Sequence, residues 1–168
     1  FRRVLFRSPE APTEVIVREK AAPPVKGNGL TAEMYKQVSA AIPDPTERAM
    51  FLAQTSHESV NFTHLSENLG YSFKALKKLQ PNIKNLQKYT DAQLTDIANA
   101  GPVAVGNAMY GGRMGNAPDE GYKYRGRGYI QLTGKKNYEA AGRALGVDLV
   151  GNPDLASSPT VAMKIALQ

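Results

Sequence analysis

The sequence predicts a mainly α fold. Residues that favour helix N-termini recur along the chain, glycines follow several of the expected helices, and only one short segment alternates like a strand. The chain has 168 residues, 42% of them hydrophobic, and no cysteine. This length suits one domain with its own core. The lack of cysteine excludes disulfides, thiolate metal sites and a cysteine nucleophile.

The first 28 residues differ from the rest. Residues 1–28 are rich in Pro, Glu, Lys and Ala without an amphipathic period, which predicts a disordered tail or linker. Residues 1–8, FRRVLFRS, could be the end of a lost upstream domain or a cloning or assembly artefact, and their apolar core is too short for a signal peptide. The net charge of +6 divides equally between this tail and the expected domain over 29–168. A mildly basic domain approaches any anionic polymer more readily and is compatible with cell wall or nucleic acid.

Capping residues define the expected helices. Thr31, Asp44, Ser72 and Thr90 are typical N-caps, and Asp44 is followed by the Pro and Glu that usually open a helix. Helices are expected over 32–42, 45–60, 73–79, 91–100, 135–146 and from 159 onward. The sequence contains no run of about 18 apolar residues, so we expect no stable membrane insertion.

A glycine-rich loop and a short strand complete the expected elements. Residues 110–128, YGGRMGNAPDEGYKYRGRG, predict a long irregular loop, and loops of this length inside a domain are often functional. Residues 129–133, YIQLT, alternate in polarity and predict a strand. The period of two would place Gln131 and Thr133 on one face, which either lines a cleft or is simply half-exposed.

Two glutamates, Glu58 and Glu67, are the candidate catalytic pair. Glu58 follows Phe51 and Thr55 at helical spacing, so we expect it on a partly apolar face where desolvation raises the pKa of its carboxyl group. Glu67 lies in a polar segment, SENLGYS, that is typical of a turn. Two carboxyl groups in unlike surroundings are what glycoside hydrolysis requires. Solvated surface charges would give the same pattern.

Two other motifs suggest metal binding and nucleic-acid binding. His57 and Glu58 begin the H-E-x-x-H motif of zinc proteases, but Asn61 stands where the second histidine should be, so we expect no metal. The segment 121–129, GYKYRGRGY, mixes aromatic and basic residues, as in single-stranded nucleic-acid sites and in sugar-binding clefts. This segment alone leaves both readings open.

Several motifs together resemble glycoside hydrolase family 19. They are HES at 57–59, SEN at 66–68 and YRGRGYIQLTGKKNY at 124–138, in that order. The likeness covers roughly residues 30–168 and is greatest to the phage and prophage endolysin branch, where few residues separate the glutamates and cysteines are dispensable. Plant-type chitinases of the family carry a longer insertion there and usually disulfides. One departure is the bulky Val60, because relatives usually have a glycine-containing segment after HES.

The resemblance implies a fold and a set of roles. The fold would be lysozyme-like and two-lobed, with a small β element, and C-terminally truncated because the family's last helices would follow Gln168. Glu58 would be the general acid, Glu67 the general base and Thr133 a holder of the attacking water, in an inverting reaction without cofactor. The cleft residues implied are His57, Tyr71, Tyr124, Arg127, Gln131 and Asn137.

The resemblance also implies a function, with two alternatives. We expect an endolysin-type glycosidase that cleaves β-1,4 bonds of peptidoglycan, made in the bacterial cytoplasm and acting on the cell wall. Its partner would be a glycan and not nucleic acid, and it would be a monomer that could be tethered to an upstream domain. A chitinase of the same family is the first alternative. A non-catalytic glycan- or nucleic-acid-binding module is the second.

Overall fold

The computed structural model describes residues 29–168, and the predicted linker over 1–28 lies outside them. The described chain is helical, with isolated bridges in place of extended strands. Its elements are α1 (Ala32–Ala41), α2 (Pro45–Glu58), α3 (Phe73–Leu79), η1 (Lys84–Leu86), α4 (Asp91–Ala100), α5 (Pro102–Tyr110), α6 (Lys135–Leu145), η2 (Pro153–Ser157) and α7 (Pro159–Ala166). The prediction of a mainly α fold is confirmed.

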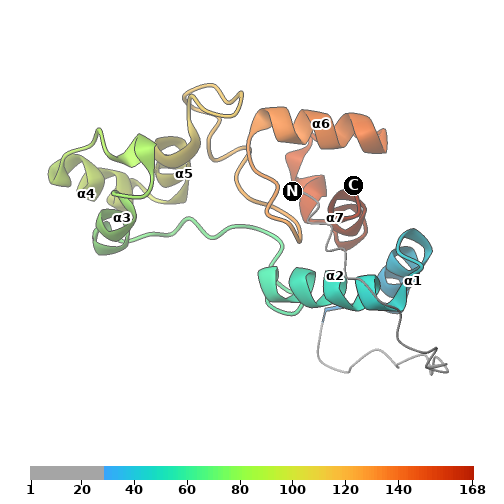
Figure 1. Cartoon of the computed structure of the whole chain (residues 1–168). Coiled ribbons are helices and arrows are strands. Elements are labelled where there is room, and N and C mark those ends of the chain that lie inside the picture. Colours follow the sequence, from blue (N-terminus) through green and yellow to red (C-terminus); the bar gives the residue numbers. More distant parts are fainter. Residues whose placement is uncertain (1–28) are drawn as a thin grey trace, which may run out of the picture.

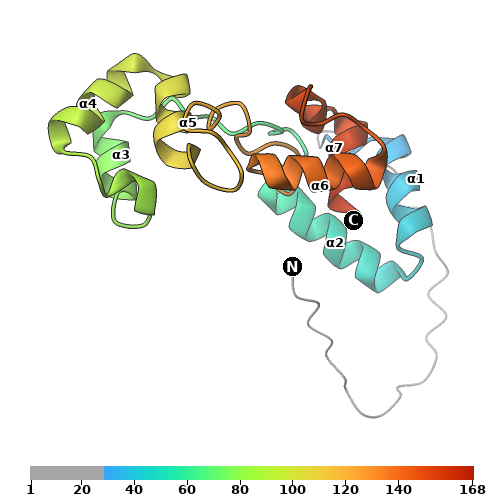
Figure 2. The same ribbon diagram turned by 90° about the horizontal axis from the view of Figure 1, so that it is seen from above.

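The helices form two lobes, as Figures 1 and 2 show. One lobe contains α3, α4 and α5, and the other contains α1, α2, α6 and α7. Two segments connect them: the extended chain after α2 and the long loop after α5. The C-terminal end of α2 lies beside the tip of this loop in both views. The candidate catalytic segments therefore meet where the lobes join.

Each lobe has its own hydrophobic core. In the α3–α5 lobe, the core contains Leu69, Leu76, Leu86, Leu94, Val105, Ala108 and Met109. In the other lobe, Met34, Val38, Phe62, Tyr129, Ala162 and Met163 pack α1 against α7, and a second cluster forms under α6. Tyr124, Tyr138 and Leu149 belong to that second cluster and are fully buried. Burial of these side chains fixes the loops on both sides of the site.

The predicted capping residues act as expected. The side chains of Thr31, Asp44, Ser72 and Thr90 each accept a hydrogen bond from a backbone N–H in the first turn of α1, α2, α3 and α4. Thr90 and Gln93 form a complete capping box. These bonds satisfy N–H groups that would otherwise lack partners at the helix ends.

Helix α5 is an element that the sequence analysis missed. Gly101 terminates α4, and Pro102 after it has the appearance of a helix stop. In the structure Gly101, at φ +91°, both ends α4 and begins α5, with Pro102 in the first turn. The α5 sequence, PVAVGNAMY, is apolar nearly all round, so it lacks an amphipathic period.

The predicted strand over 129–133 is wrong. Three residues at positive φ, Gly128 (+73°), Gln131 (+52°) and Gly134 (+88°), turn the chain, and only isolated bridges from Arg127 to Ser66 and to Leu132 remain. The expected faces are wrong as well, because Tyr129 is fully buried while Ile130 is 40% exposed. The alternation of polar and apolar residues over 129–133 therefore belongs to a tight turn and not to a β-strand.

Candidate active site

Glu67 is held by two donors that come from distant parts of the chain. Its Oε1 accepts a hydrogen bond from the Tyr110 hydroxyl at 2.7 Å, and its Oε2 accepts one from the Gly126 N–H at 3.1 Å. The Glu67 N–H in turn donates to the Gly126 carbonyl at 2.8 Å. The carboxylate is partly buried and its orientation is set at both oxygens.

Three predicted site residues converge on Gly126. A Cβ atom added there would lie 2.6 Å from Oε1 of Gln131, 3.2 Å from Oε2 of Glu67 and 3.4 Å from Oγ1 of Thr133. Only glycine therefore leaves room for these side chains to meet. The structure thus brings Glu67, Gln131 and Thr133 together around one point.

The turn over 131–134 orients the polar groups beside Glu67. The Thr133 hydroxyl donates to the Gln131 carbonyl at 2.8 Å, and the Gln131 side-chain amide donates to the Gly128 carbonyl at 3.2 Å. The Asn137 side chain, in α6, donates to the Thr133 carbonyl at 2.7 Å. Gln131 adopts its left-handed conformation at φ +52°. Strained residues of this kind cluster at functional sites.

The environment of Glu58 differs from the one that the sequence predicts. It is the last residue of α2 and is exposed, so it is not the desolvated carboxyl group that the helix spacing suggested. The buried face of α2 contains Arg48 and Thr55 and continues to Ser59, which directly follows the helix. Ser59 is one position beyond Glu58. Glu58 instead stands at the open end of the helix.

A left-handed turn follows Glu58. Val60, Asn61 and Phe62 all have positive φ, at 48°, 57° and 63°, although none is glycine. The buried Ser59 hydroxyl supports this turn by accepting from the Phe62 N–H at 3.0 Å and donating to the Thr55 carbonyl at 2.6 Å. The turn reverses the chain so that it runs from α2 toward Glu67.

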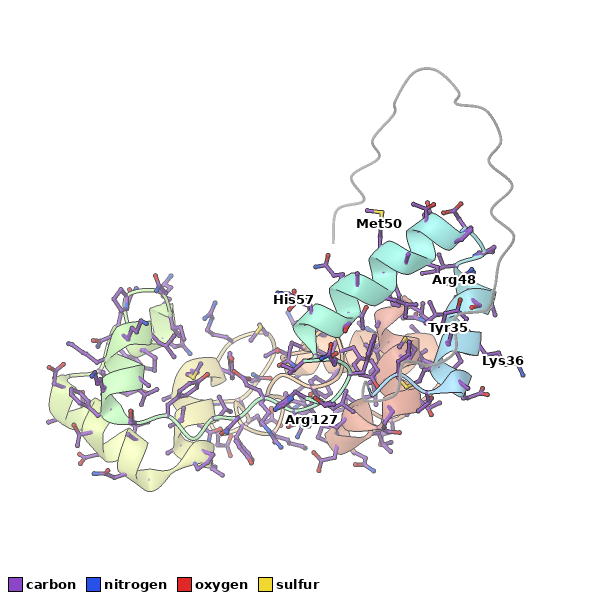
Figure 3. The ribbon with its side chains drawn as sticks, turned by 90° about the horizontal axis from the view of Figure 1, so that it is seen from below. Tyr35, Lys36, Arg48, Met50, His57 and Arg127 are labelled. Atoms are coloured by element: carbon purple, nitrogen blue, oxygen red, sulfur yellow. The ribbon has the colours of Figure 1, made fainter. Side chains whose placement is uncertain are left out.

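Two predicted cleft residues are in the core. Tyr124 is fully buried and its hydroxyl donates to the Val150 carbonyl at 3.1 Å. Arg127 is 2% exposed and donates to the Lys123 carbonyl at 2.8 Å, to the Tyr138 hydroxyl at 2.9 Å and to Asp154 at 2.7 Å. The burial of both side chains argues against the expected sugar contacts. Figure 3 labels Arg127 among the loops where the lobes join.

The remaining predicted residues lie nearer the site. His57 is exposed at the C-terminal end of α2, where Figure 3 labels it. Tyr71 is partly buried, and burial, followed by the negative charge of Glu67, raises the pKa of its phenol. An open cavity of about 500 Å³ has Gln131, Thr133 and Asn137 in its wall, with Met114 and several small or aliphatic side chains of α6.

The described residues form neither a metal-binding cluster nor a membrane-spanning helix. Over 29–168, no three His, Asp or Glu side chains come close enough together to hold a metal ion. In the same range, no helix combines the length and apolar character that crossing a membrane requires.

Comparison with known proteins identifies the family. Residues 108–168 match the family model described as Chitinase class I. A Glycosyl hydrolase family 19 domain-containing protein of Haemophilus influenzae is 37% identical over 145 residues, which cover 76% of this chain and 68% of that protein. The chain belongs to glycoside hydrolase family 19. The predicted membership in a family of glycosidases is confirmed, and the endolysin branch stays a prediction.

Other family 19 proteins match over smaller shares of their length. Chitinase 3 of Oryza sativa subsp. japonica is 37% identical over 121 residues, which cover 71% of this chain and 31% of the rice protein. A solved bacterial family 19 chitinase is 30% identical, with a TM-score of 0.45, over 82% of this chain and 57% of that structure. The chain thus spans little more than half of the solved structure and under a third of the rice chitinase.

Tyr110 is a residue of the candidate site that the sequence did not predict. Its hydroxyl makes the shortest hydrogen bond to Glu67, from a helix that was not predicted. Burial, and then the hydrogen bond to Glu67, raises the pKa of the Tyr110 phenol well above its usual range. The only feature of the sequence that could have indicated this role is the position of Tyr110 at the start of a glycine-rich loop.

Proposed function

We propose that residues 29–168 form the catalytic domain of an inverting glycosidase that cleaves β-1,4 bonds in the glycan of bacterial peptidoglycan. The observation that carries this proposal is the convergence of Glu67, Thr133 and Gln131 around Gly126. Family membership supplies the reaction class. The proposal needs no metal or cofactor, because two carboxyl groups and a water molecule suffice for hydrolysis.

The geometry at Thr133 suits a holder of the attacking water. Its hydroxyl proton is committed to the Gln131 carbonyl, so the oxygen offers lone pairs only. A water molecule beside it would donate one hydrogen bond to Thr133 and the other to Glu67. Its own lone pair then stays free to attack the anomeric carbon. Glu67 takes the proton of the water as the new C–O bond forms.

Glu58 completes the reaction as the general acid. It donates its proton to the glycosidic oxygen as the bond from that oxygen to the anomeric carbon breaks. Its exposure at the end of α2 leaves the carboxyl group accessible to a bound polysaccharide. The acid and the base thus come from two segments that the left-handed turn after Glu58 connects.

Two features favour peptidoglycan as the substrate. Only eight residues separate Glu58 from Glu67, and the chain has no cysteine, which together are typical of the endolysin branch. We therefore propose an enzyme that is made in the bacterial cytoplasm and acts on the cell wall as a monomer. Chitin is the second candidate substrate, because matched relatives such as the rice protein are named chitinases.

The non-catalytic alternative is less well supported. A nucleic-acid site would use the tyrosines of the basic loop as stacking platforms. Tyr124 and Tyr129 are fully buried, and Arg125 stacks over Tyr122 at 4.2 Å. Little of the loop's aromatic surface is left for bases.

The experiment compares reducing-end release from purified peptidoglycan and from colloidal chitin. We expect release by the wild-type protein, faster from peptidoglycan, and a loss of roughly 10²- to 10⁴-fold in both Glu58→Gln and Glu67→Gln. Faster release from chitin would favour the chitinase. Full activity in either variant, or no release by folded wild-type protein, would reject the proposed function.

A further inference from the structure

We propose that Tyr110 is a positioning residue for the reaction, which holds Oε1 of Glu67 so that Oε2 faces Thr133 and the attacking water. This inference rests on the proposed function, since it assigns Glu67 the role of base. It adds a residue from the α3–α5 lobe to a site whose other predicted members come from the opposite lobe or from the connecting segments.

The two carboxylate oxygens of Glu67 have different hydrogen-bond donors, and this gives them different roles. Oε1 is taken by Tyr110 at 2.7 Å, whereas Oε2 receives the longer bond from the Gly126 N–H at 3.1 Å. Oε2 is also the oxygen within reach of the point where Thr133 and Gln131 converge. A carboxylate fixed at Oε1 cannot rotate away, so Oε2 is the one left to accept the proton of the water.

The Tyr110 hydroxyl is itself rigidly placed. Tyr110 ends α5, directly after the core residues Ala108 and Met109. Its carbonyl accepts from the Asn116 side chain at 2.9 Å, and the same Asn116 side chain accepts from the Lys135 N–H, at the start of α6, at 2.8 Å. Asn116 is 6% exposed. It therefore ties the end of α5 to the helix that follows Thr133.

Tyr110 remains a donor at neutral pH. Burial and the adjacent Glu67 raise the pKa of its phenol, so the hydroxyl keeps its proton well above neutral pH. Tyr110→Phe removes this donor and leaves Oε1 without its 2.7 Å hydrogen bond. The carboxylate should then rotate, which moves Oε2 away from Thr133.

The test compares kcat and KM in Tyr110→Phe, with Tyr89→Phe as the matched control. Tyr89 packs against the same core of the α3–α5 lobe but makes no hydrogen bond to Glu67. For Tyr110→Phe we expect kcat to fall about 10- to 100-fold with KM almost unchanged. Tyr89→Phe should leave both kcat and KM near the wild-type values.

A second measurement keeps the inference separate from the proposed function. In a crystal structure of Tyr110→Phe, the Glu67 carboxylate should be rotated away from its wild-type orientation, whether or not the protein cleaves glycan. An inactive wild type with this difference rejects the proposed function and retains Tyr110 as the residue that orients Glu67. An unchanged carboxylate orientation in the variant, or an unchanged kcat in an active enzyme, overturns the inference.

Discussion

At the residue scale, the Thr133 hydroxyl has a role that substitution can isolate. Thr133→Val keeps the branched shape but removes the oxygen that would accept from the water, so we expect kcat to fall about 10- to 100-fold with little change in KM. Thr133→Ser keeps the oxygen and should keep most of the rate. Initial rates on soluble glycan fragments measure both. A fully active Val variant, or a Ser variant as poor as Val, would contradict the role.

The sequence allowed part of the site to be predicted at this scale. Glu67, Gln131 and Thr133 lie in motifs, and the structure brings them together. Tyr110 could not be predicted, because it reaches Glu67 across 43 positions of sequence. The family resemblance placed Arg127 in the cleft, and its burial depends on distant contacts that the sequence does not reveal, such as the one with Asp154, 27 positions away.

At the element scale, the left-handed turn after α2 is strained, because three consecutive non-glycine residues have positive φ. Val60 sits at φ +48° with 57% of its surface exposed, so a β-branched side chain is held in a conformation that it rarely adopts and buries little in return. We expect Val60→Gly to stabilise the fold by about 0.5–1.5 kcal/mol, because relief of this strain exceeds the added chain entropy.

A second exposed valine provides the control for that prediction. Val103 is 54% exposed but lies in α5, where glycine should destabilise by a few tenths to about 1 kcal/mol. Urea unfolding of both variants gives the free energies. Destabilisation by Val60→Gly comparable to that by Val103→Gly would show that the turn is not strained.

Helix boundaries were predictable where a local signal exists. The four cap residues form side-chain bonds within one turn, which a single sequence can reveal. The turn at 60–62 and helix α5 depend instead on tertiary contacts. Gly29, for example, donates to the Asn61 carbonyl at 2.7 Å, and Gly106 in α5 packs closely against Tyr122.

At the scale of the whole molecule, buried tyrosines make stability sensitive to alkaline pH. Burial raises the pKa of Tyr129 from 10.0 to about 12, because its ring lies edge-on to Phe62 in a closed core and the charged form would be desolvated. The folded state therefore keeps a proton that the unfolded chain loses. The stability due to Tyr129 is complete below pH 10 and is lost as the pH rises toward 12.

Tyr129→Phe should remove this contribution. Between pH 9 and pH 12, we expect the wild type to lose about 2 kcal/mol more of its free energy of unfolding than the variant. Tyr71, Tyr110 and Tyr138 also have raised pKa values and remain in both proteins, so the comparison isolates Tyr129. Equal losses in urea unfolding at the two pH values would contradict the prediction.

The lobes themselves were predicted only through the family resemblance. Composition and caps indicate helices, but nothing local says that α3, α4 and α5 form a separate core from the remaining helices. That division places Tyr110 on one side of Glu67 and Gly126, Gln131 and Thr133 on the other. The site is therefore a property of how the lobes meet.

The most direct test of the account is the anomeric configuration of the first product. In the proposed mechanism, water activated by Glu67 and Thr133 attacks from the face opposite the leaving group, so a β-1,4 substrate should release the α-anomer. Proton NMR of fresh product, read before mutarotation, distinguishes the anomers. We predict α-anomer in excess at the earliest time points. A β-anomer in excess would mean retention, and Glu67 would not be the base that activates water.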